Sequence, residues 1–130
     1  MPEASLEDWI EKAEQDFAYT RLGMRRSKHL LYDGVCFHAQ QCAEKYVKAY
    51  LVHHNIAFPK IHDLVELRRL CLQADESFAL ITDSLKLLYL YAVDIRYPGL
   101  TATKEDAQGA IIAMKQVRQF VRSRLGLKAR

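Results

Sequence analysis

Apolar residues return every three or four positions along most of the chain, which is the spacing of one buried face of an α-helix. No stretch shows the sustained alternation of apolar and polar residues that is typical of a β-strand. The second predicted helix, whose apolar stripe includes Val35, Cys42 and Tyr50, is expected at the centre of the fold. Helices are predicted near residues 6–28, from Asp33 or Gly34 to about 55, over a shorter stretch from Ile61 or His62, at about 77–95, and from Thr103 to about 126.

The ends of these helices are marked by capping and helix-breaking residues. Ser5 with Asp8 and Thr103 with Asp106 resemble capping boxes, in which two residues satisfy each other's backbone amides. Pro59 and Pro98–Gly99 interrupt the helical pattern. Because the predicted connections are short, successive helices should run antiparallel. The sequence therefore predicts an all-α fold, an up-and-down antiparallel bundle of about five helices.

The composition fits one small domain. The chain has 130 residues, half of them hydrophobic, so residues 1–130 are expected to form a single helical domain. No apolar run is long enough to suggest a membrane span. The first fourteen residues hold five acidic residues and one lysine, unlike the basic start of a secretory signal. A cytoplasmic protein is expected.

The cysteines and histidines do not form a metal-binding pattern. Cys36, Cys42 and Cys71 are odd in number and match neither a CxxC pair nor a zinc framework, so we expect buried thiols in a reducing compartment. His53 and His54 are adjacent on a helix and point about 100° apart, which does not suit a shared metal. No metal and no cofactor are expected.

A polar stripe on the second helix is the first candidate ligand site. His38, Gln41, Lys45 and Lys48 are three, seven and ten residues apart, which places them along one side of the helix. Two lysines in such a stripe suit a phosphate group. The alternative is a solvated helix face on which Glu44 and Lys48 form an ordinary ion pair.

Two further segments add candidate residues. The turn that follows Arg96 and Tyr97 suits projection of the guanidinium toward a phosphate or carboxylate. His62 and Asp63 open the third predicted helix, where Asp63 is a candidate cap and His62 titrates in a range useful for acid–base work. Alternatively, Arg96 hydrogen-bonds the carbonyl end of the fourth helix or pairs with Asp63, Asp94 or Glu44.

Basic residues gather near the ends of two predicted helices. Cations at helix C-termini are favoured by the helix dipole whatever the function, whereas convergence of the two groups would favour contact with RNA. One group lies on the last helix and the other ends the first: Lys115, Arg118 and Arg122; and Arg21, Arg25, Arg26 and Lys28.

Five segments together resemble the HEPN domain family. The most specific are the central stretch from Tyr32 to Lys48 (YDGVCFHAQQCAEKYVK) and Arg96–Gly99 (RYPG). The others, in chain order, are Trp9, Ala13 and Asp16; His62, Asp63 and Leu64; and Thr103, Glu105, Asp106 and Ala107. The resemblance spans nearly the whole chain and implies a helical bundle.

The resemblance also implies functions. Family members commonly form homodimers, are often encoded beside a minimal nucleotidyltransferase, and bind nucleotides or cleave RNA in toxin–antitoxin modules. The RNA-cleaving members share an arginine followed by four to six residues and a histidine. Here no histidine follows Arg96, and seven and three residues separate Arg21 and Arg25 from His29.

The first hypothesis is therefore a non-enzymatic homodimer that binds a nucleotide or RNA end beside a nucleotidyltransferase. In this hypothesis Arg96, Lys45 and Lys48 position the phosphate, and Tyr97 or Tyr46 stacks on the base. The alternatives are a metal-independent ribonuclease that uses His62 or His38, and a purely structural interaction bundle.

Overall fold

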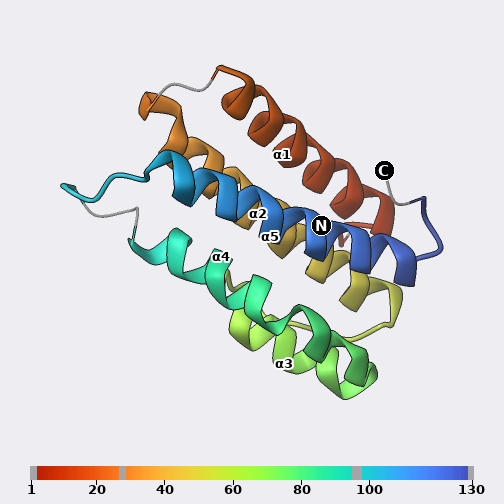
Figure 1. Cartoon of the computed structure of the whole chain (residues 1–130). Coiled ribbons are helices and arrows are strands. Elements are labelled where there is room, and N and C mark those ends of the chain that lie inside the picture. Colours follow the sequence, from red (N-terminus) through yellow and green to blue (C-terminus); the bar gives the residue numbers. More distant parts are fainter. Residues whose placement is uncertain (1–2, 27–28, 95–97, 129–130) are drawn as a thin grey trace.

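The computed structural model describes residues 3–26, 29–94 and 98–128, and within these residues the regular structure is entirely helical. The five α-helices form an antiparallel bundle, as the apolar spacing predicts (Figure 1). The elements are α1 (Leu6–Arg26), α2 (His29–His53), α3 (Leu64–Ala74), the 3₁₀ helix η1 (Glu76–Ile81), α4 (Thr82–Asp94) and α5 (Lys104–Arg124). None of the described helices is long and apolar enough to cross a membrane.

Helix α2 forms the centre of the bundle, as expected. It contacts each of the other four α-helices, and its buried side chains cover more than one side of its circumference. A helix surrounded in this way needs apolar residues around most of its axis rather than along one stripe. The fully buried residues of α2 include Ala39, Cys42, Tyr46, Ala49 and Tyr50.

The capping residues behave as the sequence predicts. Ser5 N donates to Asp8 Oδ2 at 2.9 Å, and Asp8 N donates to Ser5 Oγ at 3.1 Å. Thr103 and Asp106 form the same reciprocal pair at the start of α5. Asp63 caps α3 by accepting from the amides of Val65 and Glu66.

Three predicted boundaries are wrong. Helix α2 begins at His29 rather than at Asp33 or Gly34, because Asp33 is no cap: its Oδ1 accepts from Ala102 N at 2.6 Å and fixes the approach to α5. Helix α3 begins at Leu64, one residue after its cap. The predicted helix at 77–95 is divided, because η1 has the tighter 3₁₀ winding, which places Phe78 and Ile81, both buried, on the same side.

The three cysteines are buried and free, as expected. Burial raises the pKa of the Cys36 and Cys71 thiols to about 12, with further contributions from nearby carboxylates. Burial also raises the pKa of Cys42. Thiols held in their neutral form are poor nucleophiles, so they belong to the core.

Candidate ligand site on the central helix

Two carboxylates that are almost fully buried organise the polar side chains of α2. Asp16 comes from α1, and Glu44 from α2 itself. A buried carboxylate requires hydrogen-bond donors or opposite charges around it, because desolvation of an unpaired charge is costly. Each therefore gathers its own set of donors.

Asp16 holds His38 and Lys45. His38 Nδ1 lies 2.7 Å from Asp16 Oδ1, and Lys45 Nζ donates to Asp16 Oδ2 at 2.5 Å. The His38 ring stacks on Tyr19, with ring centroids 4.7 Å apart and an angle of 21° between the planes, and Phe37 meets it edge-on. Tyr19 and Phe37 are both exposed, so this set presents two aromatic side chains beside a histidine and a lysine.

Glu44 holds Gln40, Lys48 and His62. Gln40 Nε2 donates to Glu44 Oε1 at 3.0 Å, whereas Lys48 Nζ at 3.1 Å and His62 Nδ1 at 2.8 Å share Oε2. Because a carboxylate only accepts, the contact places a proton on Nδ1 of His62. The His62 side chain is 76% exposed, so its Nε2 is left for solvent or a ligand.

Lys48 is buried between aromatic rings. Its Nζ lies 5.4 Å from the centroid of the Trp9 ring and 5.9 Å from that of Phe58. The interpretation of the stripe as a solvated face with an ordinary Glu44–Lys48 pair is therefore wrong, because the pair exists but both partners are buried. Lys48 therefore stabilises the buried carboxylate of Glu44 and does not itself face solvent.

Four of the eight predicted site residues, His38, Gln41, Lys45 and Lys48, lie on α2. Gln41 Nε2 donates to Gln40 Oε1 at 2.7 Å, and Gln40 in turn contacts Glu44, so Gln41 joins the Glu44 set. Asp63 does not join the Glu44 set, because its carboxylate caps α3 by accepting from Val65 N. Arg96 and Tyr97 lie outside the described residues. Their predicted place beside His62 and the stripe stays a prediction.

Tyr46 is wrong as a stacking residue. It is fully buried, and its hydroxyl donates to Glu14 Oε2 at 2.5 Å and accepts from Arg122 at 3.0 Å. Burial and the bond to Glu14 raise the pKa of this phenol. The same carboxylate receives two bonds from Arg118, at 2.8 and 2.7 Å.

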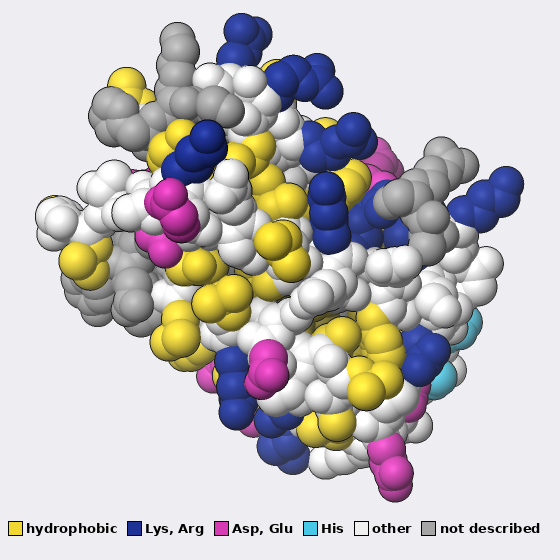
Figure 2. Space-filling view, in the orientation of Figure 1, with side chains coloured by type: hydrophobic (Ala, Val, Ile, Leu, Met, Phe, Trp, Pro, Cys, Tyr) yellow, Lys and Arg dark blue, Asp and Glu magenta, His cyan; other side chains and the backbone are white. Residues whose placement is uncertain are grey.

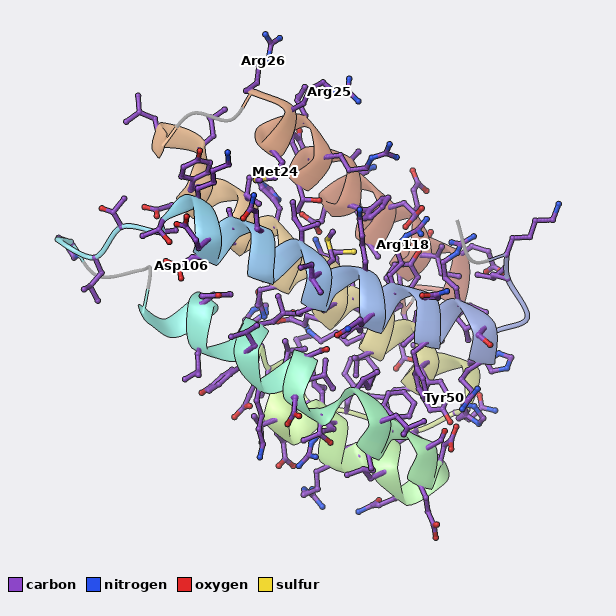
Figure 3. The ribbon with its side chains drawn as sticks, in the orientation of Figure 1. Met24, Arg25, Arg26, Tyr50, Asp106 and Arg118 are labelled. Carbon is purple, nitrogen blue, oxygen red and sulfur yellow. The ribbon has the colours of Figure 1, made fainter. Side chains whose placement is uncertain are left out.

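The ion pair between Glu14 and Arg118 shows what the basic residues of α5 do. Arg118 lies between α5 and α1, almost fully buried, with its guanidinium 4.1 Å from the centroid of the Phe17 ring (Figure 3). It therefore ties two helices together instead of meeting solvent at a helix end or RNA. Arg122 also faces this network, so only Lys115 of the group is exposed.

The sequence analysis did not place Asp16, Glu44 or Tyr19 in the site: Asp16 entered only through the family resemblance, Glu44 only as an ion-pair partner, and Tyr19 not at all. Asp16 lies between Ala13 and Phe17 on the buried side of α1, and Glu44 lies between Ala43 and Tyr46 on α2. A single acidic residue inside an apolar helical stripe is the signal that identifies a buried ionic site. Tyr19 has no such signal, because its role depends on the approach of His38 from another helix.

The described residues define a class of protein: an all-helical bundle with ionic networks on its central helix. A model of the HEPN domain family matches residues 6–124, so the chain belongs to the HEPN domain family. The crystal structure of an archaeal HEPN homologue is similar, with a TM-score of 0.70 and 25% identity over 95% of this chain and 99% of that one. No curated protein matches the chain.

Proposed function

We propose that this HEPN domain binds a nucleotide or an RNA end at the α1–α2 surface, as a homodimer beside a minimal nucleotidyltransferase in a toxin–antitoxin-like module. The observation that carries the ligand assignment is the cluster of the exposed rings of Tyr19 and Phe37 around the half-buried His38, next to Lys45. Aromatic side chains beside cations are the combination that binds unpaired bases together with their phosphates. The dimer and the partner rest on family membership.

Each buried carboxylate of the site pairs with one lysine. Asp16 pairs with Lys45 and Glu44 pairs with Lys48, so both ammonium groups are held in place. A phosphate then finds Lys45 and His38 already oriented by Asp16.

The test is binding of a fluorescently labelled single-stranded RNA, measured by anisotropy. Tyr19→Ala removes an exposed ring and should weaken binding by about 1–3 kcal/mol for one stacked base. Leu127→Ala, an exposed truncation beyond the end of α5, is the control and should bind like the wild type. Unchanged affinity in both Tyr19→Ala and Lys45→Gln, with normal melting curves, would remove the basis of the assignment.

A ribonuclease is the second candidate, and the Glu44–His62 pair favours it. A carboxylate that fixes Nδ1–H leaves Nε2 as an oriented proton acceptor, as general-base catalysis requires. The sequence lacks the arginine-to-histidine spacing of the RNA-cleaving members. We therefore expect purified protein to show no metal-independent RNA cleavage above a control that carries Arg96→Ala and His62→Ala together. Robust cleavage that these substitutions abolish would establish the ribonuclease instead.

A further inference from the structure

A groove of about 600 Å³ lies between the C-terminal half of α1 and the N-terminal half of α5. Its lining combines three apolar side chains (Met24, Ile111, Ile112), three cations (Arg21, Arg25, Lys115) and Gln108. This lining contains no carboxylate. Hydrophobic side chains follow this face of the molecule with lysine and arginine side chains beside them (Figure 2), and Figure 3 places Met24 between the two helices.

The groove begins beyond the last side-chain hydrogen bonds described between α1 and α5. Nearer the start of α1, Arg118 binds Glu14 through two hydrogen bonds, and Thr20 Oγ1 donates to Met114 Sδ at 3.5 Å. Beyond Thr20, α1 lies tightly on α2 instead, since a Cβ on Gly23 would come within 2.6 Å of Val35 Cγ2. The facing side of α5 is left uncovered, and Ile112 is 60% exposed.

The cations of the groove are available to a partner. Arg25 and Lys115 are exposed and form no ion pair with any of the described residues, and the guanidinium of Arg21, also exposed, lies 5.7 Å from the centroid of the Phe17 ring. This differs from the other clustered cations near α1, such as Lys45 and Arg118, which carboxylates already neutralise. An apolar floor with unpaired positive charges along it selects an occupant that is both apolar and acidic.

We propose that this groove binds an amphipathic helix of a partner protein, with aliphatic side chains on Met24, Ile111 and Ile112 and carboxylates directed at Arg21, Arg25 and Lys115. Helices α1 and α5 run antiparallel (Figure 1), and a groove between two helices is the kind of surface into which an amphipathic helix fits. The inference rests on the part of the proposed function in which the domain binds a protein partner. It does not depend on RNA binding.

Two other occupants fit less well. RNA would need rings on which bases stack, and the lining has none. The acidic start of α1 in a second copy has matching charge, in Glu7, Asp8 and Glu11, but its neighbour Ile10 packs against the core of its own bundle. That segment would bring carboxylates without the apolar stripe that the floor requires.

The experiment uses a labelled synthetic helix of roughly 18 residues, about five turns, with leucines on one side and glutamates flanking them. Anisotropy should show binding to the full chain. Ile112→Asp, and separately Arg25→Glu with Lys115→Glu, should each weaken it by at least about tenfold. The charge-reversed double variant should instead gain affinity for the same peptide with lysine in place of glutamate. Lys86→Glu, an exposed change on α4, is the matched control and should have no effect.

Three results would overturn the inference. The first is equal binding of a scrambled peptide of the same composition. The others are a wild-type dimer that Ile112→Asp converts to monomer, and RNA binding that requires Arg25 and Lys115 but not Ile112. Melting curves confirm that each variant is folded. The Tyr19→Ala comparison separates the two proposals. If the wild-type chain binds RNA but not the peptide, the proposal for the groove is contradicted. If it binds the peptide but not RNA, the proposed ligand site is contradicted.

Discussion

Three carboxylates determine where most of the charged side chains near the core are held. Asp16 and Glu14 each accept from at least two donors on other helices, whereas Glu44 accepts from Gln40 and Lys48 of its own helix and from His62 in the loop before α3. Because the lysines and arginines around each carboxylate form ion pairs with it, their side chains are held in fixed orientations. Arg25 and Lys115 at the α1–α5 groove differ from these cations, because they form no ion pair with a described residue.

Glu14 should make the stability of the bundle depend on pH. Burial raises the pKa of Glu14, but the bonds from Arg118 and Tyr46 outweigh it, so the pKa lies below the ordinary value of 4.5. The unfolded chain then binds more protons in this range, and the free energy of unfolding should decrease as the pH falls below about 4.5. Glu14→Gln should flatten this dependence, as denaturant titrations at several pH values would show.

The same substitution should also destabilise the protein at neutral pH. Arg118 would remain buried with an uncharged partner, at a cost of about 1–3 kcal/mol. Glu11→Gln, an exposed change one turn earlier on α1, is the control and should leave the stability unchanged. An equal pH dependence in both variants would show that Glu14 is not the group responsible.

At the scale of the helices, the parts that depend on local sequence are the predictable ones. The reciprocal caps at Ser5–Asp8 and Thr103–Asp106 are encoded within four residues, and both are found in the structure. The start of α2 was not predictable in this way. Asp33 is a residue type that often caps a helix, but its carboxylate accepts a hydrogen bond from the backbone amide of Ala102, 69 residues away. The candidate site is similar: its residues on α2 follow from spacing, whereas Asp16 and Tyr19 join through the approach of α1.

The closeness of α1 and α2 gives a prediction at Gly23. A methyl group there would meet Val35, a stiff β-branched side chain that is fully buried. Gly23→Ala should therefore destabilise the bundle by about 1–3 kcal/mol, although alanine is the better helix former. Denaturant unfolding measures the loss.

A double-mutant cycle identifies the cause of that loss. If the two side chains collide, Val35→Ala should make Gly23→Ala less harmful than it is in the wild type. At Gly34, where an added Cβ would meet nothing within 4 Å, alanine should be tolerated. Additive effects of the two substitutions would mean that Gly23 matters for another reason.

At the scale of the whole molecule, the bundle offers separate surfaces for separate tasks. The α1–α2 surface carries the proposed ligand site, and the groove between α1 and α5 carries the proposed helix site. A third surface, on η1 and α4, exposes Leu80, Leu87 and Leu90. Leu87 and Leu90 are three residues apart and so share one side of α4, and exposed leucines on one helix face are typical of a surface that meets another protein.

We expect this third surface to form the homodimer. A two-fold axis beside α4 would bury the leucines of both copies against each other, as an isologous interface requires. Light scattering of the wild-type chain at micromolar concentration should give twice the mass of one chain, and Leu87→Glu with Leu90→Glu should give a single chain that is still helical. Because both positions are exposed, this variant keeps its core. Leu22→Glu, an equally exposed change on α1, is the control and should stay dimeric. A wild-type monomer would contradict the homodimer, and a dimer that survives the α4 changes would move the interface to another surface.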